Sequence, residues 1–444
     1  MNLLGVIGIL LGIALLIFLS YKGFHVVYVA LICILAVALL NNLPLLATVT
    51  DTFMAGSSGF FKSMFLYFFF GGIIAQLYKE SGAAVAISKG VLGYFKKSDA
   101  QMDIKKGIYV CLATMTVIGA ILFFGGVNGL VAILALYPIA LSLFEELNIH
   151  RKYIPGLIYG TTVFATCAPG SVQMINVIPS QILGTSSTAG LISGLIGSLV
   201  MLILCLVYLY HLLMKAHKNG EVFVARENDA KFGADKELPN FFVSLVPLIF
   251  TFITYNFFKW NLLVALTAAI LIGCALFYKQ FSRNGYLASI KKMLNDSVGS
   301  SVIATVIGCS LVGFGAVVQS TAAFQTIVSA VTGLQGVPPL LLLAISVAVI
   351  VGITSNGNGG ISMAIPLLEP IFAPMGVSAE AIHRVATFAS TTLDTLPTNA
   401  GVIALMSMVG TNPKESYRPV MMTTVVIPAV GTLVVLVLMS MGIN

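Results

Sequence analysis

Apolar segments of roughly 18 residues or more recur from one end of the chain to the other, and this feature constrains the fold most. Hydrophobic residues make up 58% of the 444 positions and charged residues only 9%, against roughly 25% in an ordinary soluble domain. That balance excludes a soluble enzyme, a disordered chain and a nucleic-acid-binding domain. A transmembrane barrel would show alternating segments of about ten residues, which the sequence lacks. The sequence therefore predicts an all-α polytopic membrane protein.

Motifs of enzymatic and metal chemistry are missing from the sequence. All six cysteines fall inside apolar segments and none forms a CxxC pair, so neither a disulfide framework nor a zinc site is expected. No HExxH or Walker A motif is present. We predict that the protein is not an enzyme, holds no metal or cofactor and binds no nucleic acid. The N-terminal segment lacks a positive n-region and an A-x-A site, and we interpret it as a retained first helix.

Four of the apolar segments are interrupted by small residues, glycine and proline. A helix that breaks inside a bilayer frees backbone groups that need partners. We predict two re-entrant helical hairpins and two broken helices, which leaves about ten transmembrane spans. In chain order these are the hairpin 107–145, the broken helix 153–183, the hairpin 338–372 and the broken helix 381–410, interrupted by GGVNG, CAPGS, TSNGNGG and LPTN.

Lysine and arginine fall mainly on one side of the membrane in this topology. Twenty of the 23 lie on one side, and only Lys62, Lys259 and Arg384 lie on the other. The positive-inside rule makes the richer side cytoplasmic, so both termini are predicted to be extracytoplasmic. His383 and Arg384 open the tenth span on the outer side. We expect Arg384 to anchor at the lipid headgroups; the alternative is that it guides anions toward the site.

The two halves of the chain resemble each other weakly. Asn128-Gly129 and Asn356-Gly357 are 228 positions apart, and two further pairs share that offset, namely Pro138 with Pro366 and Pro169 with Pro397. In the predicted topology the halves have opposite orientations. We therefore predict a first inverted repeat at 1–212, a cytoplasmic linker at 213–240 and a second inverted repeat at 241–444. Inverted repeats with discontinuous helices are typical of secondary transporters, with the substrate bound where the breaks converge.

Polar residues at the four interruptions are the candidate substrate-binding groups. Amides and hydroxyls can donate to carboxylate and hydroxyl oxygens, and helix N-termini attract anions. No cationic side chain lies among the interruptions in the sequence, so an anion would be held by dipoles and neutral donors. The hairpin tips could equally be ordinary turns. The candidates are Asn128, Gly129, Thr166, Ser171, Ser355, Asn356, Asn358, Thr398 and Asn399.

Asp394 is the outstanding ionisable residue within the apolar segments. It lies some 13 residues into a span and three before Pro397 in the break at LPTN. An ionised aspartate at the bilayer centre costs roughly 2.5–3.5 kcal/mol on insertion scales, so it needs a proton, a partner or a cation. We expect Asp394 to couple transport to an ion; the alternative is an aspartate that caps the broken helix.

Three motifs resemble the gluconate permease (GntP) family of the ion transporter superfamily. GGIIAQLYKESGAA at 71–84 is similar to its "GKLxExSGAA" stretch, and HRVATFASTTLDTLPTNAGVI at 383–403 is similar to "HRxAxxASGGLDxLPHNGAVI". TNPKESYRP at 411–419 resembles the "THKESY" that follows. The chain departs from the pattern at Thr398, where the family has histidine, and at Ala400-Gly401, where it has Gly-Ala. The missing histidine puts the usual proton coupling in doubt and leaves room for sodium.

The resemblance implies a homodimer in the bacterial cytoplasmic (inner) membrane, with a scaffold domain and a mobile, elevator-type transport domain. It also implies symport of a small organic anion, such as gluconate or another sugar acid or hydroxy acid, usually with H⁺. A cation/proton antiporter of the same architecture is the alternative, because Asp394 could alternate between Na⁺ and H⁺. Neither the particular acid nor the coupling ion follows from the sequence. A membrane-embedded enzyme would need a His/Asp or His/Glu constellation that the sequence lacks, and a channel would need continuous pore-lining helices.

Overall fold

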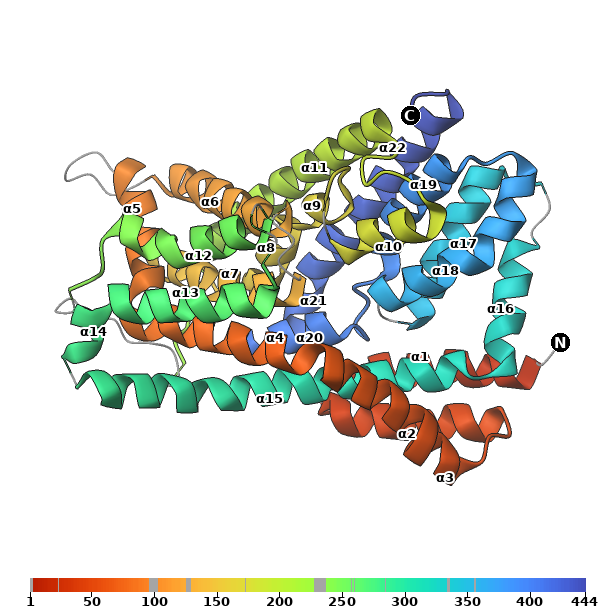
Figure 1. The fold of residues 1–444 in the computed structure, drawn as a ribbon, viewed down its shortest axis with the longest axis horizontal. Helices are drawn as coiled ribbons and strands as arrows, with labels where there is room; N and C mark the ends of the chain where they lie inside the picture. The colour runs from red at the N-terminus through yellow and green to blue at the C-terminus, as the bar shows by residue number, and fades with distance from the viewer. Residues whose placement is uncertain are drawn as a thin grey trace. The chain divides into compact units, whose positions relative to one another are not determined.

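Helices form every regular element in the described part of the chain, which confirms the predicted all-α class (Figure 1). The computed structural model describes residues 3–22, 24–95, 103–124, 129–171, 173–226, 237–256, 258, 260–283, 285–333, 336–354 and 357–444.

The chain divides by packing into two compact units. Unit 1 comprises Met1–Met64, Val163–Cys205 and Ala304–Asn444, and unit 2 comprises Phe65–Thr162 and Leu206–Ile303. Each unit takes segments from both halves of the sequence, so this division by packing differs from the predicted division into repeats at 1–212 and 241–444. The inverted repeats stay a prediction. Three helices continue from one unit into the other: α4 (Met54–Ser81), α11 (Leu191–Lys218) and α15 (Tyr286–Gln319).

Unit 1 contains three of the four predicted interruptions. Helices α17 (Pro339–Thr354) and α18 (Gly357–Phe372) pack against each other and against α19 (Ala379–Leu393), as Figure 1 shows. Helix α10 (Met174–Leu183) packs on α18 and α19. Its elements, besides parts of α4, α11 and α15, are α1 (Leu3–Tyr21), α2 (Val26–Leu40), α3 (Leu45–Ala47), η1 (Thr48–Phe53), α9 (Val163–Cys167), α10 (Met174–Leu183), α16 (Ala322–Thr332), α17 (Pro339–Thr354), α18 (Gly357–Phe372), η3 (Ala373–Met375), α19 (Ala379–Leu393), α20 (Ala400–Val409), α21 (Pro413–Met421), η4 (Met422–Val426) and α22 (Ile427–Ser440).

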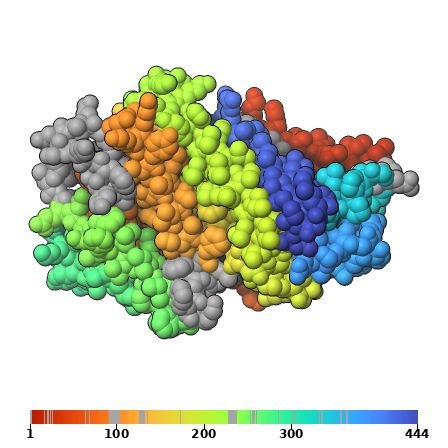
Figure 2. All heavy atoms as spheres, turned by 90° about the horizontal axis from the view of Figure 1, so that it is seen from above, coloured from red at the N-terminus to blue at the C-terminus, as the bar shows by residue number. Residues whose placement is uncertain are grey.

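Small residues let α11 and α22 approach closely in unit 1. A Cβ atom added at Gly197 would lie 2.7 Å from Val435, and one added at Gly431 would lie 2.5 Å from Met201. Within a membrane, such small-residue contacts are a main way in which helices pack. In Figure 2 the dark-blue spheres of α22 accordingly lie against the yellow-green spheres of the segment that contains α10 and the start of α11.

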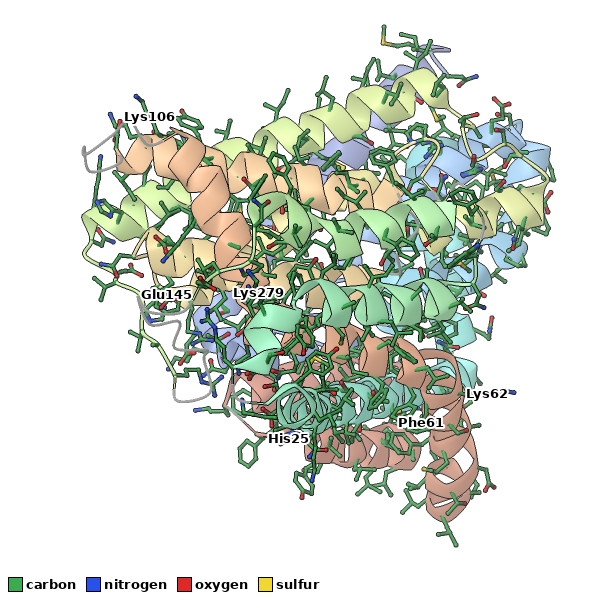
Figure 3. The ribbon with its side chains drawn as sticks, turned by 60° about the vertical axis from the view of Figure 1, so that its left-hand side comes forward. His25, Phe61, Lys62, Lys106, Glu145 and Lys279 are labelled. Atoms are coloured by element: carbon green, nitrogen blue, oxygen red, sulfur yellow. The ribbon has the colours of Figure 1, made fainter. Side chains whose placement is uncertain are left out.

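Unit 2 contains the predicted hairpin 107–145. Its elements, besides parts of α4, α11 and α15, are α5 (Ala83–Phe95), α6 (Ile104–Phe124), α7 (Gly129–Glu146), η2 (Arg151–Tyr153), α8 (Ile154–Gly160), α12 (Phe241–Asn256), α13 (Leu262–Leu276) and α14 (Tyr278–Ser282). Charged residues lie near the ends of these helices: Figure 3 shows Lys106 in the first turn of α6, Glu145 in the last turn of α7 and Lys279 in α14. Charged residues at helix ends agree with the prediction that the loops lie outside the apolar segments.

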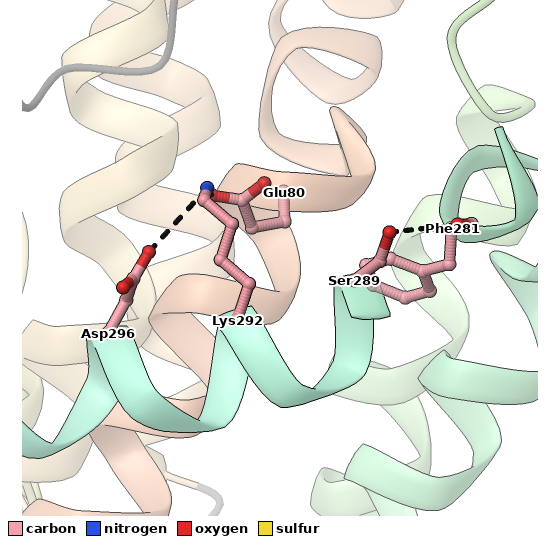
Figure 4. A network of polar contacts seen from close by, with 5 residues as sticks. All are labelled: Glu80, Phe281, Ser289, Lys292 and Asp296. Atoms are coloured by element: carbon pink, nitrogen blue, oxygen red, sulfur yellow. Dashed lines mark hydrogen bonds and ion pairs between the residues drawn. The ribbon is translucent and has the colours of Figure 1, made fainter. Parts of the chain in front are cut away.

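Polar contacts hold α4 and α15 together within unit 2. Lys292 of α15 donates to Glu80 of α4 at 2.7 Å and lies 3.5 Å from Asp296 one turn further along, as Figure 4 shows. A further bond joins α15 to α14, in which Ser289 donates to the Phe281 carbonyl at 2.9 Å. Because the Lys292 side chain is 60% exposed, we expect the ion pair of Lys292 and Glu80 to contribute little to the free energy of unfolding.

Four helices in the described residues are long and apolar enough to cross a membrane: Ile104–Phe124, Leu191–Lys218, Tyr286–Gln319 and Pro413–Ser440, the last running through α21, η4 and α22. A fifth span is possible if Leu45–Lys62 and Phe65–Ser81, bent by 45°, form one element. Shorter apolar helices make up much of the rest. The first of the four is α6, which was predicted as one limb of a re-entrant hairpin. The hairpins and the count of about ten spans therefore stay predictions.

Candidate functional site

Asp394 lies where the break in 381–410 meets the start of α18. Helix α19 ends at Leu393, and Asp394 follows as its C-cap residue. One carboxylate oxygen, Oδ1, accepts from the backbone N–H of Gly357 at 2.6 Å and from the Asn399 side-chain amide at 3.1 Å. Gly357 is the first residue of α18, so the carboxylate binds one of the N–H groups that a helix start leaves without a partner. The contact joins the start of α18 to the break between α19 and α20.

The charge of Asp394 is balanced by dipoles. Among the described residues, no lysine or arginine forms an ion pair with this carboxylate, and its hydrogen bonds come from neutral N–H groups. The N-terminus of α18 carries partial positive charge, which favours an anion there. Such an aspartate can still take up a proton or lie beside a small cation. The aspartate does act as a cap, but for α18, by accepting from Gly357 N–H. Asn399 caps α20 by accepting from Val402 N–H at 3.0 Å.

Glycine at position 357 leaves room for the Asp394 carboxylate, which lies against it. A Cβ atom there would be 2.7 Å from Asp394 Oδ2, 2.8 Å from its Cγ and 3.0 Å from Ile175 of α10. Contacts under 3.0 Å force something to shift. Gly357 in TSNGNGG therefore permits the close approach of the start of α18 to Asp394.

Other predicted residues lie in the same part of unit 1. Thr398 is fully buried at the break, Asn399 is partly buried, and Asn358 is partly buried in the first turn of α18. Ser355 and Asn356 lie outside the described residues. The structure thus brings Asp394 and Asn399 into contact. Thr398 is adjacent to Asn399 in the chain, and Asn358 is adjacent to Gly357. Their roles in substrate binding stay predictions.

The chain leaves the helical conformation at CAPGS, within the predicted broken helix 153–183, which itself stays a prediction. Helix α9 ends at Cys167 and α10 begins at Met174. Gly170 has φ +76°, a conformation that favours glycine, and its N–H donates to the Ser187 carbonyl at 2.9 Å. Thr166 is partly buried in the last turn of α9, and Ser171 is fully buried. A further interruption at Thr161 and Thr162 separates α8 from α9 and was not predicted.

Arg384 overturns two expectations about charge. Its side chain is fully buried, so the prediction of a headgroup anchor is wrong. It donates to the Cys167 carbonyl at 2.8 Å, which places a cation at the first break, contrary to the expectation that the breaks contain none. The same guanidinium donates to the carbonyls of Ala189 at 2.7 Å and Ser187 at 3.3 Å.

Asn176 of α10 completes this buried cluster. Its Oδ1 accepts from Arg384 Nη1 at 3.1 Å and lies 3.1 Å from His383 Nε2. Its Nδ2 donates to the carbonyls of Ser171 at 2.7 Å and Ser187 at 2.9 Å. Sequence reasoning missed Asn176, which no break motif contains. The adjacent pair His383-Arg384, four residues into α19, was the available signal that two polar side chains enter the unit.

The predicted tip of the first hairpin lies in unit 2. Gly129 begins α7, and Asn128 lies outside the described residues. The convergence of all four breaks therefore stays a prediction. In the part of the chain that the structure describes, no group of three or more His, Cys, Asp or Glu residues could hold a metal ion. The absence of a metal or cofactor was expected and stays a prediction as well.

The all-α fold with helices of spanning length defines a multi-pass membrane protein. No protein-family model matches the chain. The chain is similar to the uncharacterized transporter YxjC of Bacillus subtilis (strain 168), with 27% identity over 466 aligned residues that cover 94% of this chain and 95% of the relative. Among solved structures it is similar to the Alcanivorax borkumensis YdaH transporter, with a TM-score of 0.38, 12% identity and 89% of each chain covered.

Similarity to a transporter over nearly the whole chain, together with the spanning helices, supports a membrane transporter. The same similarity favours a function other than an enzyme's. It supports membership of a transporter family without singling out the gluconate permease family.

Proposed function

We propose that the protein is a secondary active transporter, a symporter that imports a small organic anion such as gluconate or another sugar acid or hydroxy acid. An H⁺ or Na⁺ gradient drives the uptake, and Asp394 is the ion-coupling group. The single observation that carries this proposal is the contact between the Asp394 carboxylate, the N-terminus of α18 and Asn399. A carboxylate balanced by neutral donors gains most from a bound proton or cation, which is what coupling requires.

The neutral donors around the break suit an organic anion. Thr398, Asn399 and Asn358 offer hydroxyl and amide groups, which match the carboxylate and hydroxyl oxygens of a sugar acid. Thr166 and Ser171 of the first break, together with Asn128, Gly129, Ser355 and Asn356 of the hairpin tips, complete the proposed substrate site. The resemblance to the gluconate permease family supports this substrate class.

The remaining expectations belong to the same proposal. The resemblance supports a homodimer, elevator-type scaffold and transport domains, and the bacterial inner membrane. The distribution of lysine and arginine supports extracytoplasmic termini. A cation/proton antiporter remains the alternative, because the same carboxylate could bind Na⁺ and H⁺ in turn.

Uptake into proteoliposomes tests the proposal. Labelled gluconate is offered, with and without a panel of unlabelled acids, under an imposed pH gradient and separately under a sodium gradient. Uptake driven by either gradient supports the symporter and names the ion. If no acid is taken up and sodium moves against protons, the symporter is wrong and the antiporter replaces it.

Asp394→Asn tests the coupling role. The asparagine keeps an oxygen for the Gly357 N–H but loses the charge, so gradient-driven uptake should be abolished while the protein stays folded. Glu380→Gln is the matched control, since it removes an exposed carboxylate from the same helix, and it should transport like the unchanged protein. Normal gradient-driven uptake by Asp394→Asn would remove Asp394 from coupling.

A further inference from the structure

Arg384 connects three separate pieces of the first break to α19. Its guanidinium reaches the end of α9 at Cys167, the side chain of Asn176 on α10, and the carbonyls of Ser187 and Ala189 in the segment before α11. Four of its five N–H groups are thereby used. Among the described residues it forms no ion pair with a carboxylate, so its charge is balanced by carbonyl and amide oxygens.

The carbonyl and amide oxygens at this break need a donor that can reach several directions at once, as a guanidinium can. Helix α9 has five residues, and its last carbonyls have no partner within the helix. A buried carbonyl that lacks a donor costs free energy comparable to a lost hydrogen bond. The planar guanidinium presents donors in several fixed directions, whereas a lysine ammonium is a point charge. One arginine therefore satisfies acceptors from three segments at once.

Asn176 is fixed from both sides of its amide. Its oxygen accepts from Arg384, and its nitrogen donates to the Ser171 and Ser187 carbonyls. With that oxygen as acceptor, His383 carries its hydrogen on Nε2, and its Nδ1 accepts from the Thr185 hydroxyl at 2.7 Å. Each polar group of the cluster then has a partner, which specifies one arrangement of the break.

The aliphatic part of the Arg384 side chain is closely packed against Gly190 and Gly194. A Cβ atom at Gly190 would lie 2.9 Å from Arg384 Cγ, and one at Gly194 would lie 2.9 Å from Arg384 Cδ. Gly190 also has φ +58°. The start of α11 therefore leaves room for the arginine only because these positions are glycine.

We propose that Arg384, acting through Asn176, is a positioning residue that holds the first helix break in one geometry and joins it to the second broken helix. It binds the carbonyl of Cys167, the residue after Thr166, and the side chain of Asn176, whose amide in turn binds the Ser171 carbonyl. Thr166 and Ser171 belong to the proposed substrate site. The consequence for substrate affinity rests on the proposed transport function, whereas the geometry of the break does not.

The reactivity of Cys167 tests the geometry without any substrate. Cys167 and Cys205 are both fully buried in unit 1, but only Cys167 lies at the break. Purified protein in detergent is treated with N-ethylmaleimide, and the labelling of each cysteine is followed by peptide mass spectrometry. In Arg384→Met the ratio of Cys167 to Cys205 labelling should rise about tenfold, because the break opens locally. Arg151→Met removes another buried arginine, from unit 2, and should leave the ratio unchanged.

Asn176→Asp supplies a second, milder variant. It keeps an oxygen for Arg384 and His383 but replaces the amide that donates to Ser171 and Ser187, so the ratio should again rise. If Cys167 stays as protected as Cys205 in Arg384→Met, the proposal is wrong. If Arg384→Met does not fold, the ratio in Asn176→Asp decides in the same way, and an equal rise at both cysteines would overturn the proposal.

Uptake kinetics then test the positioning role. Asn176→Asp should raise the KM for the transported acid about tenfold and leave Vmax within about twofold, since the break is misplaced while Asp394 is intact. An unchanged KM would overturn the positioning role. Failure of the unchanged protein to transport any acid would overturn the proposed function instead and would leave the labelling result standing.

Discussion

Gly357→Ala is the most direct single test of the contact between Asp394 and the N-terminus of α18. The added Cβ would lie 2.7 Å from Asp394 Oδ2, and ordinary contacts begin near 3.4 Å, so the carboxylate would have to retreat by about 0.7 Å. The hydrogen bond from Gly357 N–H, now 2.6 Å, would lengthen to about 3.3 Å, beyond the range of a good N–H···O bond.

The magnitude follows from two opposing effects. A hydrogen bond to a charged group contributes about 1.5–3 kcal/mol to stability, and this contribution is lost. Alanine in place of glycine in a helix gains at most about 1 kcal/mol. The net loss is therefore about 0.5–2 kcal/mol, and the misplaced carboxylate should also impair gradient-driven uptake.

The assay compares melting temperatures of the detergent-solubilised protein. Gly59→Ala in α4 is the matched control, because no atom lies within 4 Å of the added Cβ and only the gain in helix propensity remains. Gly357→Ala should melt below the unchanged protein and Gly59→Ala at or above it. A Gly357→Ala protein that melts and transports like Gly59→Ala would show that the carboxylate does not lie against the start of α18.

Three further changes test other parts of the structure. Ser378 caps α19 by accepting from Ala381 N–H at 3.2 Å, so Ser378→Ala should cost about 1 kcal/mol, measured as a lower melting temperature than that of Ser440→Ala at the exposed end of α22. Hydrogen bonding from Lys152, and then from Tyr153, holds the pKa of Glu221 below its ordinary value. Its contribution to stability is therefore present at neutral pH and lost as the pH falls through that lowered pKa, so the melting temperature should fall less steeply with acid in Glu221→Gln; equal slopes would refute this. Gly190→Ala, at φ +58° and with its Cβ 2.7 Å from Met439, should destabilise more than Gly59→Ala in the same melting assay.

Local signals in the sequence located the interruptions. Glycine and proline cannot sustain a regular helix without cost, and α9 indeed ends within CAPGS while α20 begins after LPTN. The prominence of Asp394 also followed from a local signal, because a carboxylate in an apolar segment needs a partner. What remained open was which helix it would cap, since Gly357 lies 37 positions earlier in the chain.

The role of Arg384 could not be predicted because its partners are distant in sequence. The carbonyls that it binds lie 195 to 217 positions away, and nothing in the residues around it specifies them. Position near a predicted span end suggested a headgroup anchor, and tertiary packing overrode that expectation. Each compact unit combines segments from both halves of the sequence. This could not be predicted either, because it depends on contacts between segments far apart in the chain.

The long sequence separation of the Arg384 contacts has a consequence for synthesis at the ribosome. Arg384 emerges 217 residues after Cys167, which at about 5–20 residues per second is a delay of roughly 10–40 s. Every segment of unit 2 is made before Ala304, whereas unit 1 awaits the last stretch of the chain. During that interval the Cys167 carbonyl must find water or another donor, so the nascent first break stays unfinished until α19 arrives.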